Sequence, residues 1–162
     1  MEIQLIIDHL VKEIALFKEL VTILQIETED LVSRDYKGLY ETISRKEHLL
    51  VRIGSMGKIR QKLISDCANG LGITGEQNLT SIIDKTGGSR TEELKNCRDT
   101  IYSLAESVKE LNDLNSKVIK GSLENISKTL GFLGNFLPNS NYKASGAFEG
   151  FAIKGSRLNE GA

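Results

Sequence analysis

The sequence predicts an all-α protein: an elongated antiparallel bundle or coiled coil of three long helices, with a short linker helix and a disordered C-terminal tail. Apolar residues recur at alternating spacings of four and three over long stretches, which is the pattern of amphipathic helices. Aromatic residues make up only 6% of the 162 residues, and there is one Pro. A β-sandwich or barrel would need more turns and more β-branched and aromatic residues.

The first helix is expected over residues 2–32. Its apolar stripe reads Ile3, Ile7, Leu10, Ile14, Phe17, Val21, Leu24 and Leu31. Only Thr28 interrupts the series, which spans about four heptads. Ile6, Val11 and Leu20 widen the stripe, and a wide stripe is typical of a globular bundle rather than of a two-stranded seam.

A second helix is expected over residues 36–68. Asp35 is a suitable N-cap, because its carboxylate can accept hydrogen bonds from first-turn amides. The connection to the first helix is so short that the chain either bends or folds back there, and we favour folding back. Gly54 and Gly57 each cost about 1 kcal/mol relative to Ala. The helix is therefore either soft or closely packed at these glycines.

The glycine-rich stretch 69–90 predicts a linker. Within it, Thr74 and Gln77 form a capping-box pattern that predicts a short helix over 76–85. We expect this helix to cover one end of the bundle.

A third helix is expected over residues 91–137, after a second capping-box pattern at Ser89 and Glu92. Its apolar stripe slips at Asn115, where an extra step of four forms a stutter. Pro138 cannot continue the helix and ends it.

Residues 138–162 show no periodicity and are predicted to be a disordered tail after the helical domain 1–137. The tail also carries large apolar side chains: Tyr142, Phe148, Phe151 and Ile153. These either dock on a partner or fold back on the bundle.

The composition argues against several classes of protein. The net charge is −1, whereas a nucleic-acid binder usually shows a clear basic excess. No apolar run approaches the roughly 18–20 residues of a membrane span, and no signal peptide is visible, so we expect a cytoplasmic protein without stable membrane insertion. Cys67 and Cys97 are expected to be reduced thiols, with a disulfide as the alternative.

The sequence offers weak support for an enzyme or a cofactor site. Gly70–Gly75 matches GxGxxG but follows a long helix rather than a strand, so we interpret it as a helix end followed by a flexible loop. The two histidines, His9 and His48, are interpreted as surface or boundary residues rather than metal ligands. The acidic cluster Glu27, Glu29 and Asp30 is interpreted as a solvated face. We therefore expect no catalytic residue, metal or cofactor.

If the first two helices fold back on each other, the third extends about 20 Å beyond them. The apolar residues of that end are Leu123, Ile126, Leu130, Phe132, Leu133, Phe136 and Leu137. An apolar stripe of this size must be buried somewhere. It could pack against a second copy, the linker helix or a partner helix, and we favour a partner.

The chain resembles the FlgN family of flagellar export chaperones over most of its length. The first two helices supply Leu10, Glu13, Leu20, Leu24, Glu27, Leu31, Asp35, Lys46, Leu49, Leu50 and Arg60 to this resemblance. The third helix and the tail supply Leu111, Asn112, Asn115, Ile119, Leu123, Tyr142 and Gly146.

The resemblance implies a cytoplasmic, non-enzymatic chaperone. Such a protein binds the C-terminal helical segments of hook–filament junction proteins, prevents their premature assembly and delivers them to the type III export gate. The implied substrate-binding residues are Ile119, Leu123, Ile126, Leu130, Leu133, Phe136 and Leu137. Tyr142 and Gly146 would serve gate docking or release, and a weak homodimer is compatible with this role. The alternative is a scaffold protein that homo-oligomerises through its heptad stripes.

Overall fold

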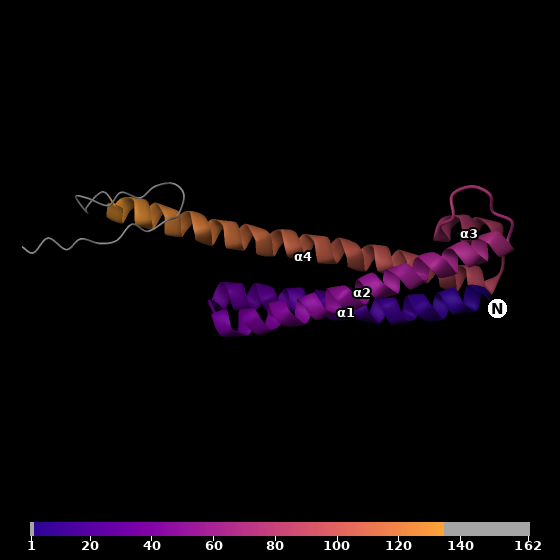
Figure 1. The fold of residues 1–162 in the computed structure, drawn as a ribbon, viewed down its shortest axis with the longest axis horizontal. Helices are drawn as coiled ribbons and strands as arrows, with labels where there is room; N and C mark the ends of the chain where they lie inside the picture. Colours follow the sequence, from indigo (N-terminus) through magenta and orange to yellow (C-terminus); the bar gives the residue numbers. More distant parts are fainter. Residues whose placement is uncertain (1, 135–162) are drawn as a thin grey trace, which may run out of the picture. The chain divides into compact units, whose positions relative to one another are not determined.

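The computed structural model describes residues 2–134, with side chains for residues 2–132. Four helices follow one another along the chain: α1 (Glu2–Ser33), α2 (Tyr36–Gly70), α3 (Leu79–Lys85) and α4 (Ser89–Gly134) (Figure 1). The described part contains no strand, so the all-α prediction of three long helices and one short helix is confirmed. The predicted tail 138–162 lies outside the described residues, as do the last residues of the helix expected to end at 137.

The chain divides into two units, Met1–Lys120 and Gly121–Ala162. The first unit holds α1, α2, α3 and most of α4. The structure describes residues 121–134 of the second unit, and these form the last turns of α4.

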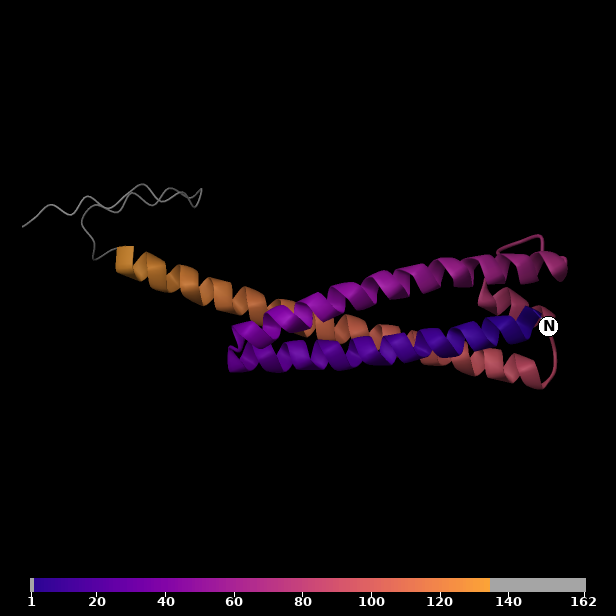
Figure 2. The same cartoon turned by 60° about the horizontal axis from the view of Figure 1, so that its bottom comes forward.

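The α1–α2 hairpin is set by two caps at one tight turn. The two helices are in contact, lie next to each other near the turn and diverge toward the opposite end (Figure 2). Arg34 takes a positive φ of 60°, and the Asp35 amide donates to the Asp30 carbonyl at 3.0 Å. This closes α1 with a Schellman-type hydrogen bond. The Asp35 carboxylate then accepts from the Gly38 amide at 3.0 Å and starts α2. The predicted N-cap and the predicted folding back are both confirmed.

The glycine-rich end of α2 is a second Schellman motif. Gly72 has a φ of 66°, and the Ile73 amide donates to the Ala68 carbonyl at 2.9 Å. Glycine suits this position because it enters the left-handed region without a Cβ clash. The motif at Gly70–Gly75 therefore ends a helix, as expected, and α2 continues to Gly70 rather than 68.

Both predicted capping boxes were wrong in detail. The short helix α3 begins at Leu79 rather than 76, because Asn78 has an extended backbone and its side chain accepts from the Ser81 amide at 2.8 Å. Gln77 instead donates to the Asn69 side chain at 2.7 Å. Helix α4 begins at Ser89, so this residue is its first helical residue and not its N-cap.

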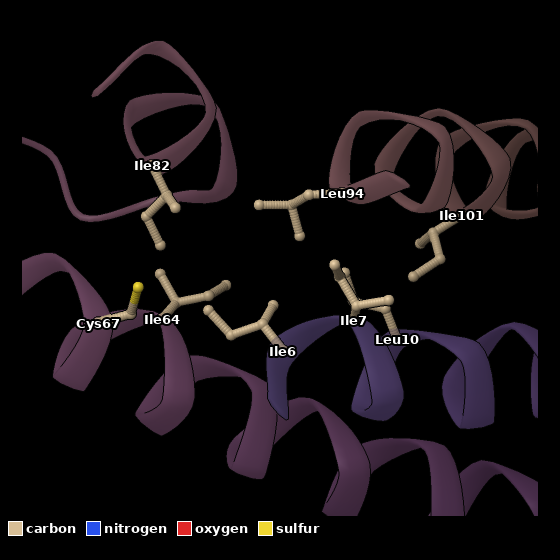
Figure 3. Packing of buried hydrophobic residues seen from close by; sticks show 8 residues of the cluster. All are labelled: Ile6, Ile7, Leu10, Ile64, Cys67, Ile82, Leu94 and Ile101. Atoms are coloured by element: carbon tan, nitrogen blue, oxygen red, sulfur yellow. The ribbon is translucent and has the colours of Figure 1, made fainter. Parts of the chain in front are cut away.

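Two buried clusters form the core of the first unit. The cluster nearest α3 draws on all four helices and contains Ile6, Ile7, Leu10, Ile64, Cys67, Ile82, Leu94 and Ile101 (Figure 3). The side chain of Ile82 is fully buried there, so α3 covers this part of the core. The second cluster contains Leu16, Leu20, Ile23, Leu24 and Leu49, with Val108 and Leu111 of α4 packed against it.

Gly54 and Gly57 of α2 are not sites of close packing. A Cβ built on Gly54 would meet no atom within 4 Å, and one on Gly57 would meet only an Arg60 side-chain nitrogen at 3.9 Å. The sequence left two interpretations of these glycines, a soft helix or close packing. Within the described residues, the structure excludes close packing at Gly54 and Gly57.

Candidate functional site

The candidate binding surface is the apolar stripe on the C-terminal part of α4. Ile119, Leu123, Ile126 and Leu130 are 42%, 59%, 56% and 47% exposed, respectively. Their spacing of four, three and four places them along one side of the helix. Leu133 lies in α4, but its side chain is not described. Phe136, Leu137, Tyr142 and Gly146 lie outside the described residues.

Earlier positions of the α4 stripe behave differently. Leu94 is 1% exposed and Ile101 is 9% exposed, and both belong to the core cluster of the first unit. Asn115 is the last buried residue of the described helix. Beyond it, the stripe presents four aliphatic side chains to solvent, and a surface of this kind favours burial against another molecule.

The residues beside the exposed stripe carry little charge. Ser122, Ser127 and Thr129 occupy flanking positions in the heptad register, and Lys120 is the charged residue among these neighbours. In coiled coils, charged flanks choose a partner by electrostatics. This stripe can therefore recognise a partner mainly by apolar burial. A Cβ on Gly121 or Gly131 would meet no atom within 4 Å.

A buried polar layer lies where the stripe changes from buried to exposed. The Asn115 amide donates to the Leu24 carbonyl and to Glu27 Oε2, both at 3.1 Å. Glu27 Oε1 accepts from Lys46 Nζ at 2.5 Å. The layer thus joins α1, α2 and α4 through groups that satisfy one another. The prediction that Glu27 belongs to a solvated face was wrong, because its side chain is only 4% exposed.

A second buried ion pair joins α1 and α2. Arg60 Nη1 donates to Glu13 Oε1 at 2.6 Å, and the Glu13 side chain is 1% exposed. Glu13 Oε2 is buried without a hydrogen-bond partner. One turn earlier, His9 Nε2 lies 2.9 Å from the Met56 carbonyl oxygen. His9 is buried rather than at the surface, whereas His48 is exposed.

The sequence analysis named these four charged residues but did not predict the ion pairs that they form. Their spacing in the sequence indicates the pairing. The glutamates Glu13 and Glu27 are fourteen residues apart, and so are their partners Lys46 and Arg60. Two heptads separate the members of each set, so both ion pairs fit one antiparallel register. Buried charges need partners, and a glutamate in an apolar series should prompt a search for a cation at matching spacing.

The described residues offer no candidate for metal chemistry. Within residues 2–134, no group of three or more His, Cys, Asp or Glu side chains is placed to hold a metal ion. No helix in that range combines the length and apolarity needed to cross a membrane. Cys67 and Cys97 are free, and burial is the main cause that raises the pKa of each thiol above its usual value.

Comparison with known proteins places the chain in a family. The model of the FlgN protein family matches residues 1–150. The uncharacterized protein YvyG of Bacillus subtilis (strain 168) is 26% identical over 145 residues, which cover 90% of this chain and 89% of that protein. No solved structure matches the chain. Since the family model covers most of the sequence, the chain belongs to the FlgN family of flagellar export chaperones.

Proposed function

We propose that this protein binds the C-terminal helical segments of hook–filament junction proteins in the cytoplasm, prevents their premature assembly and delivers them to the type III export gate. Membership of the FlgN family supports the general role. The observation that carries the proposal is the change of the α4 stripe from buried to exposed beyond Asn115.

The proposed substrate site is the stripe of Ile119, Leu123, Ile126, Leu130, Leu133, Phe136 and Leu137. Full burial of an Ile or Leu side chain contributes roughly 1.5–3 kcal/mol, and these side chains are about half exposed where described. Four of them would then contribute about 3–6 kcal/mol before the costs of association. Ordering a disordered substrate segment lowers the net affinity further, which suits a chaperone that must release its cargo.

Calorimetric titration with the C-terminal segments of the hook–filament junction proteins from the same organism tests the proposal. We expect saturable one-to-one binding that is lost when residues 123–162 are deleted. Leu130→Asp with Leu133→Asp should abolish binding with nearly unchanged helicity by circular dichroism. A matched control, Asn112→Asp with Asn125→Asp, adds the same charge at exposed positions outside the stripe and should bind normally.

Two results would contradict the substrate site. Global unfolding of the Leu130→Asp, Leu133→Asp variant would make the stripe a core element. A tight tetramer in sedimentation, with no binding of either junction-protein segment, would favour the homo-oligomeric scaffold. A monomer or weak dimer is expected instead.

The proposed export-gate or release element contains Tyr142 and Gly146. Tyr142→Ala should leave substrate affinity unchanged but reduce export of junction proteins in cells. A loss of substrate affinity in this variant would show that the two roles are not separate.

A further inference from the structure

A groove between α1 and α2 forms a second candidate surface, separate in residues from the α4 stripe. Its volume is about 580 Å³. It is lined by Lys12, Ala15, Leu16, Val51, Arg52, Ser55 and Met56. Most of this lining is apolar, and the small side chains Ala15 and Ser55 leave it open.

The apolar surface continues along both helices at helical spacing. Val51 is 71% exposed and Ile59 is 50% exposed, and Ser55 lies between them on the same face of α2. On α1, Val11 is 55% exposed, four residues before Ala15. An extended apolar groove between two parallel rows of side chains is the shape that receives an amphipathic helix.

The two charged residues that line the groove, Lys12 of α1 and Arg52 of α2, are both positive. Helix α2 carries seven Lys or Arg residues against three Asp or Glu residues, whereas α1 carries two Lys against seven Asp or Glu residues. Lys58 and Lys62, on the same side of α2 as Val51, are exposed and have no ion pair within 4 Å in the described chain. Lys12 adds a further cation from α1.

Three exposed carboxylates, those of Asp8, Glu19 and Glu47, lie one helical turn from lining residues of the groove. Arg52 Nη1 lies 3.9 Å from Glu19 Oε2, and both side chains are about half exposed or more. An exposed pair at this distance contributes little and can exchange partners. Asp8, one turn before Lys12, accepts a hydrogen bond from Gln4 at 3.0 Å.

We propose that this groove binds an amphipathic helix of another protein whose flanks are acidic. The apolar face of that helix packs on Val51, Ala15 and Leu16, while its carboxylates pair with Arg52 and Lys58. Electrostatic complementarity of this kind raises the association rate and excludes basic partners.

Charge argues against this chain as its own ligand. Residues 135–162 carry three Lys or Arg and two Glu, and residues 117–128 of α4 carry three Lys and one Glu. Both segments are net positive, and the two charged residues that line the groove, Lys12 and Arg52, are positive as well. A second copy docked groove to groove would oppose like charges, which is unfavourable.

Fluorescence anisotropy with the full-length protein and two designed helical peptides tests the inference. Both peptides carry Leu at heptad positions a and d; one has Glu at all flanking positions and the other has Lys. At about 50 mM salt, the Glu peptide should bind at least tenfold more tightly than the Lys peptide, and high salt should weaken its binding. Arg52→Glu with Lys58→Glu should weaken binding of the Glu peptide about tenfold or more.

Two further variants separate this surface from its alternatives. Lys37→Glu with Lys117→Glu makes the same change in net charge away from the groove and should bind the Glu peptide normally. Leu123→Asp with Leu130→Asp disrupts the proposed substrate stripe and should also bind it normally, so failure of one proposal is distinguishable from failure of the other.

Several outcomes would overturn the inference. These are equal affinity for the two peptides, no saturation by the Glu peptide below about 1 mM, or equal losses in the groove variant and its Lys37, Lys117 control. Binding to vesicles of phosphatidylcholine and phosphatidylglycerol without binding to the Glu peptide would identify a membrane surface instead.

Discussion

The Thr28 hydroxyl of α1 donates a hydrogen bond of 2.6 Å to Asn115 Oδ1 of α4. Thr28 interrupts the apolar stripe of α1, and Asn115 interrupts that of α4, so the two irregular positions pair with each other. The Asn115 amide also contacts the carboxylate of Glu27. A polar group in a helix interface fixes register, because any shift leaves it buried without a partner.

Asn115→Ala should lower the free energy of unfolding by about 1–3 kcal/mol, because it removes a partner from Thr28 and from Glu27 Oε2. Urea unfolding followed by circular dichroism measures the effect. Asn112→Ala changes an exposed Asn three residues earlier and should stay within about 0.5 kcal/mol of the wild type. An Asn115→Ala variant as stable as Asn112→Ala would mean that the polar layer contributes little to stability.

The Glu13–Arg60 pair predicts a non-additive response to mutation. Arg60→Ala leaves a buried carboxylate without its cation and should cost about 3–5 kcal/mol. Replacing both residues, Glu13→Leu with Arg60→Leu, removes the charge and should recover most of that loss. Urea unfolding of the wild type and of these two variants measures the free energies of unfolding. A double variant that loses as much stability as Arg60→Ala would contradict the account.

The stability lost on removing the cation of each ion pair also tests the register of the α1–α2 hairpin. The second ion pair, Glu27–Lys46, has the same register as Glu13–Arg60. Lys46→Ala should therefore behave as Arg60→Ala does, at a cost of about 3–5 kcal/mol. A much smaller cost, measured in the same unfolding assay, would show that Asn115 alone satisfies the Glu27 carboxylate.

The sequence predicted the long helices well because their apolar periodicity is strong. Asp35 was identified from its type and position. The stutter at Asn115 was also identified, but only the structure shows that burial of the stripe ends there. The burial of a polar residue was harder to predict where that residue pairs with a side chain from another helix. Glu27 lies in an acidic run that suggests a solvated surface, and only the contact with Lys46 explains its burial.

The start of α3 shows a different limit of sequence reasoning. Two cap patterns compete there, and Asn78 caps the helix while Gln77 bonds Asn69 of the preceding helix. The local sequence alone does not show which residue caps the helix, because a tertiary hydrogen bond occupies the side chain of one candidate, Gln77. For the binding surface, the apolar periodicity identified the α4 stripe, but only the structure shows that its side chains beyond Asn115 are exposed.

Gly54, inside α2, and Gly72, just after its C-terminal end, predict opposite effects of a substitution by Ala. Gly54→Ala places a Cβ in open space within a helix, so it should stabilise the protein by about 0.5–1 kcal/mol. Gly72→Ala forces a Cβ at a φ of 66° and should destabilise it by about 1 kcal/mol. Thermal unfolding measures both shifts, and a destabilised Gly54→Ala protein would show that α2 is packed there in solution.

The buried thiol of Cys67 predicts a dependence of stability on alkaline pH. Burial, with a smaller effect of Glu2, raises the pKa of Cys67 above 9.0 in the folded protein. The folded state therefore holds the thiol proton more tightly than the unfolded state. The stabilisation is complete below the unfolded pKa of about 8.5–9 and declines as the pH rises above it. Urea unfolding between about pH 7.5 and 9.5 should show a steeper loss for the wild type than for Cys67→Ala. Parallel slopes for the two proteins would mean that the thiol titrates alike in the folded and unfolded states.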